Sequence, residues 1–358
     1  MKAVVLVGGE GTRLRPLTYT TPKQLLPVVE VRLLERVLAH LAAAGVDEAI
    51  LSLGYRPDAF AAAYPEGEAA GIRLTYAVES EPLDTAGAIR FAARYGGVDS
   101  TFVAVNGDVL TDLDIVSLLS CHREHDALAT LHLTAVDDPS RFGVVSTDAD
   151  GRVLRFVEKP PSGEAPSNLI NAGTYILEPD VIERIPEDRP VSIERETFPA
   201  LTAEGRVYGV ASDAYWLDAG TPSAYLQAHA DLLDGTRGGI PSPGACSSSA
   251  GVWVLGKPNV DGDVRPFSLI GDGAVIATGA VVESSVVGAG SVIEKGAVVE
   301  GSVLLPGVHM ASGASVIGSI VGRNAVVAEG CEVAALTVVG DGVVLGRGVH
   351  LNHARVPA

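Results

Sequence analysis

The feature that most constrains the fold is a six-residue spacing of aliphatic side chains over the last part of the chain. Small residues, often glycine, fill the positions between them. The series comprises Val264, Ile270, Ile276 and Val282, then Val287, Ile293, Val299 and Leu305, then Val321, Val327, Val333, Val339, Leu345 and Leu351. A period of six matches neither an α-helix nor an alternating strand. It predicts a triangular β-solenoid of about five coils with ~18 residues each, in which every side contributes one inward aliphatic side chain.

The first 235 residues show a different pattern, in which short apolar strand candidates alternate with helical stretches. Strands are predicted at AVVLV, EAILSLG, RLTYAVE and TFVAVNGD, and helices at TAGAIRFAARY and at LLERVLAHLAAAG, which ends at Gly45. This alternation predicts an α/β domain with a Rossmann-like, mostly parallel sheet that binds ligands at the carboxyl ends of its strands. We therefore expect domains at 1–235 and 263–358, joined by a linker at 236–262 that begins rich in Gly, Pro and Ser.

Charge and cysteine content narrow the range of partners. The formal net charge is -18, with 44 acidic residues against 26 lysines and arginines. Because such a surface repels phosphate backbones and anionic lipid, we expect neither nucleic acid nor a membrane as a partner. The three cysteines are far apart, and no apolar run approaches the ~18 residues of a membrane span, so we expect a cytoplasmic protein.

The stretch GGEGTRLRPLTYTTPKQLLP, residues 8–27, points to an anionic ligand. Its glycines let the backbone turn sharply and bring N–H groups close to phosphate oxygens. Arg13 is a bidentate donor for such a group and Lys23 a point charge. Two common nucleotide loops do not fit, because Leu14 replaces the third glycine of the dinucleotide fingerprint and Gly11 is followed by Thr-Arg where a P-loop needs Lys-Ser/Thr.

GGEGTRLRP followed by PK instead resembles the signature of the sugar-1-phosphate nucleotidyltransferases, the nucleotide-sugar pyrophosphorylases. Further segments occur in that family's order: VNGD at 105, FGVV at 142, FVEKP at 156, NAGTY at 171, SIERETFPAL at 192 and YWLDAGTP at 215. The resemblance is closest to the GDP-mannose pyrophosphorylase (mannose-1-phosphate guanylyltransferase) type, which carries a C-terminal left-handed β-helix of hexapeptide repeats.

This resemblance implies an attack by a sugar phosphate oxygen on the α-phosphorus of a nucleoside triphosphate, with pyrophosphate leaving. Because two anions must meet, the expected work is positioning and electrostatic stabilisation. The first expectation is GTP with mannose 1-phosphate and Mg²⁺ as the cofactor. The implied catalytic residues are Arg13, Lys23 and Lys159, and the implied Mg²⁺ ligands are Asp108 and Asp218. The implied nucleotide-binding residues are Gly8, Gly9, Gly11, Thr12, Arg13, Thr85 and Gly87, and the implied sugar-phosphate residues are Asn106, Gly107, Glu158, Lys159, Asn171 and Gly173.

Several of these positions also allow a purely structural interpretation. Thr85 is equally a candidate helix N-cap, Asn171 could begin a turn, and Lys159 and Glu158 could form a water-exposed pair. Ser192, before Glu194, is expected to begin a helix that supports the pocket.

The substrates stay open at this point. Asp84 stands where the resembled family usually has glycine, beside the base, so its carboxylate either hydrogen-bonds a guanine edge or points to solvent. Gln24 resembles the thymidylyltransferase branch. The alternatives are therefore UTP, dTTP or ATP with glucose 1-phosphate, and a cyclitol 1-phosphate such as valienol 1-phosphate in an antibiotic pathway.

Two other classes of function are also open. The first is a hexapeptide-repeat acyltransferase, which needs a histidine base in the solenoid; His309 is internal, while His350 and His353 lie near its end. The second is a non-catalytic regulatory subunit. The flat faces and open end of a solenoid also favour a homo-oligomer.

Overall fold

The computed structural model describes residues 1–249 and 251–357, which fall into two compact units. Unit 1 comprises Met1–Gly9 and Leu34–Leu217, and unit 2 comprises Glu10–Leu33 and Asp218–Ala358. Ala250, within the predicted linker, and Ala358, at the end of the predicted solenoid, lie outside the described residues. None of the described helices is long and apolar enough to cross a membrane. Residues 10–33, which include most of the glycine-rich stretch, therefore group with the C-terminal part of the chain by their contacts.

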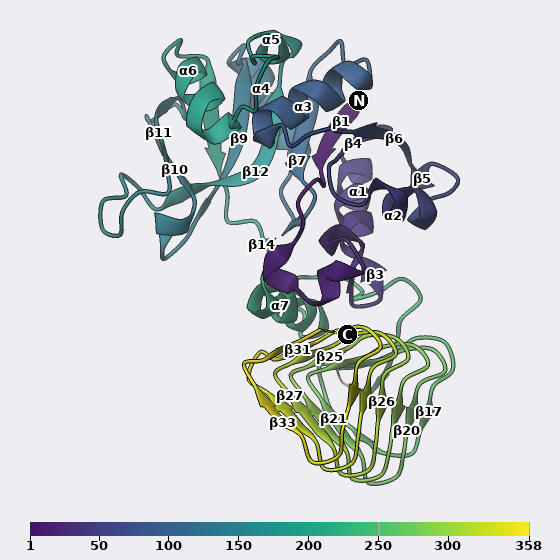
Figure 1. Cartoon of the computed structure of the whole chain (residues 1–358). Helices are drawn as coiled ribbons and strands as arrows, with labels where there is room; N and C mark the ends of the chain where they lie inside the picture. The colour runs from purple at the N-terminus through teal and green to yellow at the C-terminus, as the bar shows by residue number, and fades with distance from the viewer. Residues whose placement is uncertain (250, 358) are drawn as a thin grey trace. The chain divides into compact units, whose positions relative to one another are not determined.

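Unit 1 is built on a ten-stranded mixed sheet (Figure 1). Eight strands have the order β11-β10-β12-β7-β1-β4-β6-β5; β9 also pairs with β12, and β13 pairs with β9. The central strands β7, β1, β4 and β6 run parallel, as predicted. The strands are β1 (Lys2–Leu6), β4 (Glu48–Leu53), β5 (Glu68–Ala69), β6 (Ile72–Val78), β7 (Phe102–Asn106), β9 (Ala129–Ala135), β10 (Gly143–Thr147), β11 (Val153–Glu158), β12 (Leu169–Leu177) and β13 (Val207–Ala211). A separate pair joins β8 (Val109–Thr111) to β14 (Trp216–Asp218).

The helices follow the predicted alternation. They are α1 (Leu33–Ala43), α2 (Pro57–Ala63), α3 (Asp84–Tyr95), α4 (Ile115–Glu124), α5 (Pro179–Glu183), α6 (Phe198–Thr202) and α7 (Pro222–Leu233). The predicted stop of α1 at Gly45 is confirmed: Gly45 has φ +83°, its N–H bonds Ala42 O at 2.9 Å, and Val46 N–H bonds Leu41 O at 3.1 Å. This paired closure is the Schellman arrangement, which glycine permits because it has no Cβ.

The apolar core of unit 1 lies between the sheet and the helices packed on it. Helix α3 packs on β1 and β4, α4 on β9 and α6 on β11. Phe102, Tyr175 and Phe198 are at most 1% exposed within this core. The segment before Asp218 is not one continuous strand, because β13 ends at Ala211 and β14 begins at Trp216 in a different sheet.

Unit 2 contains the predicted solenoid, with three parallel sheets along its sides (Figure 1). The first side holds β16 (Val252–Val254), β19 (Ser268–Ile270), β22 (Val286–Val287), β25 (Val303–Leu304), β28 (Ile320–Val321), β31 (Val338–Val339) and β34 (Arg355–Val356), with β15 (Cys246–Ser249) antiparallel to β16. The second holds β17 (Asn259–Val260), β20 (Val275–Ile276), β23 (Val292–Ile293), β26 (His309–Met310), β29 (Val326–Val327) and β32 (Val344–Leu345). The third holds β18 (Asp263–Val264), β21 (Val281–Glu283), β24 (Val298–Glu300), β27 (Ser315–Ile317), β30 (Glu332–Ala334) and β33 (His350–Asn352).

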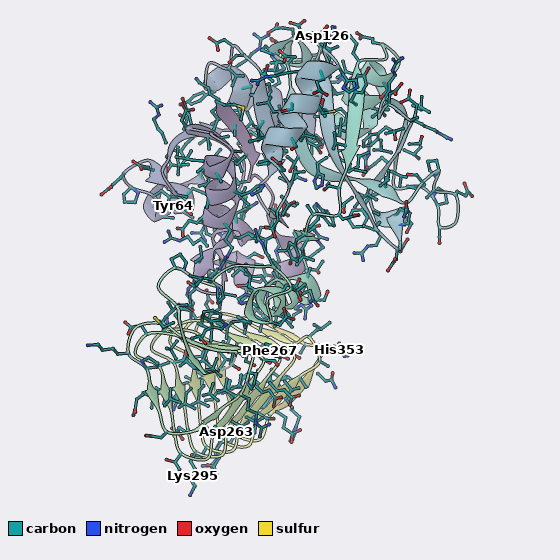
Figure 2. The ribbon with its side chains drawn as sticks, turned by 180° about the vertical axis from the view of Figure 1, so that it is seen from behind. Tyr64, Asp126, Asp263, Phe267, Lys295 and His353 are labelled. Atoms are coloured by element: carbon teal, nitrogen blue, oxygen red, sulfur yellow. The ribbon has the colours of Figure 1, made fainter. Side chains whose placement is uncertain are left out.

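The interior of the solenoid is a column of aliphatic side chains, and its charged side chains point outward. Ile276, Ile293, Val299 and Met310 are fully buried, whereas Lys295 projects from the edge of the solenoid (Figure 2). Strands β16 and β17 lie within the predicted linker and pair with β19 and β20, so the stacked strands begin before residue 263.

The spacing of the coils differs from the prediction in one respect. Val275, Val292, His309 and Val326 stack in register 17 residues apart, because one side of these coils has five residues instead of six. Leu304, which stacks on Val287, is therefore the inward residue, and the prediction of Leu305 for that position is wrong. The shorter sides turn through Ser284, Gly301 and Gly318, which have φ near +50°; glycine adopts this conformation without strain.

The segment 10–33 of unit 2 consists of short turns and one hairpin. The turns are η1 (Thr12–Leu14), η2 (Leu17–Tyr19) and η3 (Lys23–Leu25), and the hairpin pairs β2 (Pro27–Val28) with β3 (Val31–Arg32). Here we call this segment the glycine loop, because it begins at the glycine-rich motif.

Candidate active site

Gly11 sets the start of the glycine loop. It has φ +63°, and a Cβ at this position would lie 3.0 Å from Thr18 Cγ2 and 3.2 Å from Lys23 Cβ. The Thr18 hydroxyl donates to Gly11 O at 2.9 Å, and the Thr18 side chain is fully buried. The missing side chain therefore allows the turn that carries Thr12 and Arg13 to close against the turn that carries Lys23.

Arg13 and Asp218 form an ion pair within unit 2, although they are far apart in the sequence. Arg13 Nη2 lies 3.5 Å from Asp218 Oδ2, and Asp218 Oδ1 accepts a hydrogen bond from Gly220 N at 2.9 Å. A Cβ on Gly220 would lie 2.6 Å from Arg13 Nη2, so only glycine leaves room for the guanidinium. The Arg13 side chain is 51% exposed, which leaves donors available to a phosphate.

In unit 1, Asn106 is the last residue of the central parallel strand β7, and Gly107 and Asp108 follow it at the carboxyl end of the strand. Gly107 N donates to Leu6 O at 3.0 Å, and a Cβ on Gly107 would lie 2.6 Å from Val7 Cγ1. Gly107 therefore holds the turn close to β1, and Asp108 is the next residue, in the link to β8. This is the position at which open α/β sheets present ligand-binding groups.

Strand β12 is irregular beside this turn. Its pairing with β9 shifts between Asn171 and Tyr175, and Gly173 has φ +77°. Asn171 Oδ1 accepts from Gly173 N at 3.2 Å, and Asn171 Nδ2 donates to Tyr175 Oη at 2.8 Å. A Cβ on Gly173 would lie 2.5 Å from Asn106 Nδ2, which brings two predicted sugar-phosphate residues together. Asn171 thus begins a bulge rather than a simple turn, and bulges are frequent next to active sites.

Glu158 is the last residue of β11, and Lys159 follows it. Lys159 Nζ lies 3.4 Å from Glu158 Oε1, the Glu158 side chain is 18% exposed and the Lys159 side chain is 58% exposed. Lys159 has φ +47°, which is uncommon for a residue with a side chain, and its N–H bonds Phe142 O at 2.9 Å. Because such strain is concentrated at functional positions, it supports a role for Lys159 beyond a surface pair.

The start of α3 is joined to the π-helical turn η5 (Ile193–Thr197). The Thr85 hydroxyl donates to Glu194 Oε2 at 2.7 Å and accepts from Ile193 N at 2.8 Å, so Thr85 links two elements and is not simply an N-cap. Gly87 N donates to Val191 O at 3.2 Å. Ser192 is the N-cap of η5, since its Oγ accepts from Arg195 N at 3.2 Å, and the predicted helix start is confirmed.

Asp84 is explained by its backbone. It has φ +58°, and its Oδ1 accepts from Thr85 N at 2.7 Å. A left-handed residue suits glycine, and aspartate is among the residues that tolerate it. The carboxylate is therefore engaged with its own neighbour.

The remaining predicted residues divide between the two units. Gly8 and Gly9 end the first segment of unit 1, while Thr12, Lys23 and Asp218 belong to unit 2. Within the described part of the chain, no three His, Cys, Asp or Glu side chains gather into a metal site. Asp108 and Asp218 each offer a carboxylate. A carboxylate is a hard oxygen ligand of the kind that divalent cations such as Mg²⁺ prefer.

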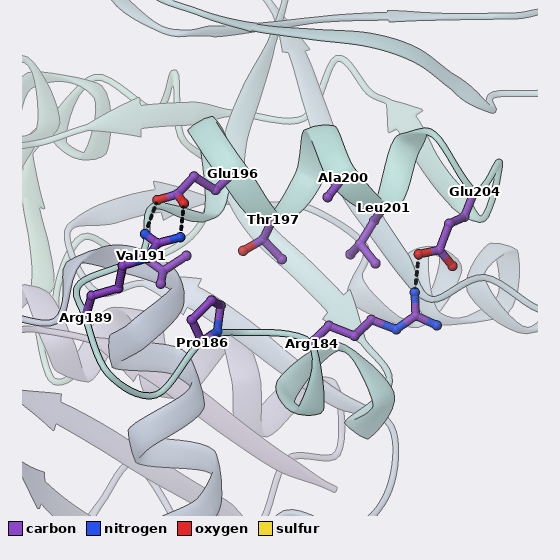
Figure 3. A pocket seen from close by; sticks show the side chains of 9 residues that line it. All are labelled: Arg184, Pro186, Arg189, Val191, Glu196, Thr197, Ala200, Leu201 and Glu204. Carbon is purple, nitrogen blue, oxygen red and sulfur yellow. Dashed lines mark hydrogen bonds and ion pairs between the residues drawn. The ribbon is translucent and has the colours of Figure 1, made fainter.

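A cavity of about 530 Å³ lies elsewhere in unit 1, beside α5, η5 and α6 (Figure 3). Arg189 at one end bonds Glu196 at 3.1 and 2.6 Å, and Arg184 at the other bonds Glu204. Both arginines that line the cavity are paired with carboxylates, and none of the predicted site residues lines it. The cavity is therefore not the candidate active site.

His309, the candidate base of an acyltransferase, lies on the outside of the solenoid. Its Nε2 is 2.8 Å from Glu294 Oε1, the other oxygen of which accepts from the backbone and hydroxyl of Ser312. The His309 side chain is 43% exposed. This surface arrangement does not favour the acyltransferase alternative.

Sequence reasoning missed three residues that shape the site. Gly220 makes room for Arg13, Tyr175 binds Asn171, and Trp216 Nε1 donates to Ala172 O at 2.8 Å within the β12 bulge. All three fall inside the motifs YWLDAGTP and NAGTY, so the motifs contained the signal, but only the fold shows which atoms meet.

Comparison with known proteins identifies the family. The profile described as "Nucleotidyl transferase" matches residues 2–235, and the profile described as "GMPPB C-terminal domain" matches residues 264–358. The chain is 42% identical over 298 residues to the mannose-1-phosphate guanylyltransferase of Mycobacterium tuberculosis, which covers 79% of this chain and 81% of that protein. It is 44% identical over 230 residues to the mannose-1-phosphate guanyltransferase of Aspergillus fumigatus, which covers 63% of this chain and 62% of that protein.

Solved structures agree on the fold of the first domain. HddC from Yersinia pseudotuberculosis superposes with a TM-score of 0.55 and 32% identity, covering 64% of this chain and 97% of that one, and HddC is also known in complex with GMP-PN. The chain therefore belongs to the nucleotidyl transferase family of enzymes and, within it, to the mannose-1-phosphate guanylyltransferase type.

Proposed function

We propose that this enzyme transfers GMP from GTP to mannose 1-phosphate, forming GDP-mannose and releasing pyrophosphate. The observation that carries the choice of substrates is the 42% identity to the mannose-1-phosphate guanylyltransferase of M. tuberculosis over 81% of that protein. The engagement of Asp84 with Thr85 removes one reason to doubt a guanine base, because the residue is accounted for by its backbone.

The reaction joins two anions. A phosphate oxygen of mannose 1-phosphate attacks the α-phosphorus of GTP, a P–O bond forms, and the bond from the α-phosphorus to the bridging oxygen of the β-phosphate breaks. The electron pair leaves with pyrophosphate. Positioning and charge neutralisation supply most of the acceleration in such transfers.

We assign the triphosphate to the glycine loop. Its backbone N–H groups face phosphate oxygens, Arg13 donates from a guanidinium held by Asp218, and Lys23 adds a compact charge. Gly8, Gly9, Thr12, Thr85 and Gly87 complete the nucleotide site in this proposal. Removing one donor of this kind costs about 10²- to 10³-fold in rate.

We assign the sugar phosphate to the turn after β7 and to the ends of β11 and β12. Lys159 binds its phosphate and Glu158 its hydroxyls, while Asn106, Gly107, Asn171 and Gly173 shape the pocket. The contact between Gly173 and the Asn106 amide supports a common pocket for these residues.

A divalent metal ion is the cofactor of this family. We propose that it is Mg²⁺ and that Asp108 and Asp218 hold it. When bound, Mg²⁺ neutralises the phosphate oxygens on which charge develops. Asp218 is paired with Arg13, and Asp108 lies in the turn after β7.

The test is pyrophosphate release measured over ATP, CTP, GTP, UTP and dTTP against mannose, glucose, acetylglucosamine and valienol 1-phosphates. We expect the highest kcat/KM for GTP with mannose 1-phosphate. A preference for UTP or dTTP, or for the cyclitol phosphate, would overturn the substrates and keep the class of reaction. No release with any pair, in a folded preparation with Mg²⁺, would overturn the class.

We further propose that the enzyme works in the cytoplasm as a homo-oligomer. The solenoid exposes open strand edges at its last coil, and such edges favour self-association. Light scattering at increasing protein concentration would reveal the oligomer, and a constant monomer mass would contradict it.

A further inference from the structure

One corner of the solenoid is a column of stacked turns. We define the corner column as Asp272, Ala289, Pro306, Arg323 and Asp341. Each turn donates a backbone hydrogen bond to the turn before it: Gly290 N to Asp272 O at 2.8 Å, Gly307 N to Ala289 O at 2.9 Å, Asn324 N to Pro306 O at 3.0 Å and Gly342 N to Arg323 O at 2.7 Å. The column is therefore rigid and regularly spaced.

The glycine loop rests on the last two turns of this column. The Thr20 hydroxyl donates to Asp341 Oδ2 at 2.7 Å, and Arg323 Nη1 donates to Thr21 Oγ1 at 3.3 Å. The other oxygen of Asp341 accepts from Arg323 N at 2.7 Å, so the two residues that hold the loop are also bound to each other. Both threonines lie between Arg13 and Lys23 in the sequence.

A second contact holds the hairpin at the end of the loop. Val29 and Glu30, its two central residues, have φ +49° and +65°. Such a turn normally takes Asn-Gly, and a β-branched residue with positive φ is strained by about 1–3 kcal/mol. This conformation persists only where the surroundings determine it.

Those surroundings come from α7 and the corner column. Val29 N donates to His229 Nδ1 at 3.2 Å, and the Val29 side chain is fully buried. Burial raises the pKa of the Glu30 carboxyl. A hydrogen bond from the Ala289 backbone N–H to this carboxyl and the nearby positive charge of Arg323 oppose that rise. The corner column thus contacts the loop at two places on opposite sides of Lys23.

We infer that the corner column positions the glycine loop for the nucleoside triphosphate, with Arg323 and Asp341 as positioning residues. Neither side chain is assigned to a substrate; each acts through Thr20, Thr21 or Glu30. The inference rests on the proposed function, because it assumes that the glycine loop binds the triphosphate. It gives the solenoid a part in triphosphate binding by the glycine loop, with which it shares unit 2.

Two Asp341 variants and a matched control test this on the full-length chain. Asp341→Ala removes both acceptors. Asp341→Asn keeps one acceptor oxygen for Arg323 N and places an amide N–H donor against the Thr20 hydroxyl, which can accept from it. Asp272→Ala is the control. Asp272 Oδ1 accepts from Lys257 N at 2.8 Å, the same kind of bond that Asp341 makes to Arg323 N, and among the described residues Asp272 makes no hydrogen bond or ion pair to the glycine loop.

Two readouts separate positioning from general stability. Steady-state kinetics should show a KM for GTP raised about tenfold by Asp341→Ala, the loss expected for one charge-assisted hydrogen bond, with the KM for mannose 1-phosphate unchanged. Hydrogen exchange should be faster in peptides covering residues 12–24. Asp341→Asn keeps only neutral hydrogen bonds, so it should change both readouts less than Asp341→Ala does, and Asp272→Ala should behave as the wild type.

Equal behaviour of Asp341→Ala and Asp272→Ala in both readouts would overturn the inference. If Asp341→Ala fails to fold, Thr20→Val removes the Thr20–Asp341 hydrogen bond from the side of the glycine loop and leaves the sequence of the solenoid unchanged. Wild-type hydrogen exchange together with a wild-type KM for GTP in Thr20→Val would also overturn the inference. Hydrogen exchange does not require turnover. If the wild-type enzyme released no pyrophosphate, the proposed function would be wrong. The comparison of hydrogen exchange between the variants and the wild type would still test the inference.

Discussion

Gly173→Ala tests the sugar-phosphate site most sharply. The new methyl group would start 2.5 Å from Asn106 Nδ2, and ordinary contact begins near 3.4 Å, so the amide must move by roughly 1 Å. A displacement of that size in a positioning group costs about 10²-fold in rate. The φ of +77° adds about 1–2 kcal/mol of backbone strain, which lowers stability but not activity.

Gly71→Ala is the matched control for Gly173→Ala. Gly71 also has φ +77°, and a Cβ there meets nothing within 4 Å. Both variants should lose about 2–8 °C in Tm, measured by calorimetry. Only Gly173→Ala should lose kcat/KM for mannose 1-phosphate, by about 10²-fold, in a pyrophosphate-release assay. Equal activity of the two variants would refute the assignment of Gly173 and Asn106 to the substrate pocket.

Three further predictions concern the metal, the solenoid and a buried histidine. Asp108→Asn should stay folded by circular dichroism yet lose most of its turnover at saturating Mg²⁺; near-normal turnover would remove Asp108 from the metal site. The Ile293 side chain is fully buried in the solenoid, so Ile293→Ala should lower the free energy of unfolding measured in urea by about 2–5 kcal/mol. The Val344 side chain is 71% exposed, so Val344→Ala should change it by less than ~0.5 kcal/mol. Equal effects of the two substitutions would contradict the assigned interior. Burial lowers the pKa of His132 to about 4. As the pH falls below about 6.5, the unfolded chain therefore binds a proton at His132 that the folded chain does not bind until the pH is near 4. The contribution of neutral His132 to the free energy of unfolding is complete above about pH 6.5 and is lost as the pH falls toward 4, at up to ~1.4 kcal/mol per pH unit. Between pH 7 and pH 5, the free energy of unfolding measured in urea should therefore fall less in His132→Gln than in the wild type. An equal fall in the two proteins would contradict this.

The solenoid could be predicted because each coil repeats one simple requirement, an aliphatic side chain facing inward. Its spacing was predicted one residue wrong at Leu305, since Leu304 and Leu305 are both aliphatic and the pattern cannot distinguish them. The choice between them is made by the turn at Gly301, where positive φ shortens the side of the coil. Turn geometry of this kind is set by a few backbone angles and leaves little trace in hydrophobic spacing.

The candidate site was predictable as a set of motifs but not as a set of contacts. The order of the motifs identified Arg13 and Asp218 separately, and their ion pair appeared only in the folded chain. The bond between Thr20 and Asp341 had no sequence signal at all, because neither residue belongs to a motif that names the other. Such pairs depend on tertiary placement, which local patterns do not encode.

The most direct test of the central claim follows the phosphorus atoms. GTP labelled in either the α- or the γ-phosphate is incubated with mannose 1-phosphate, Mg²⁺ and the enzyme, and the products are separated. The account predicts the α-label in GDP-mannose and the γ-label in pyrophosphate, in equal amounts. Release of the γ-label as orthophosphate, or an α-label that never enters a nucleotide sugar, would contradict it.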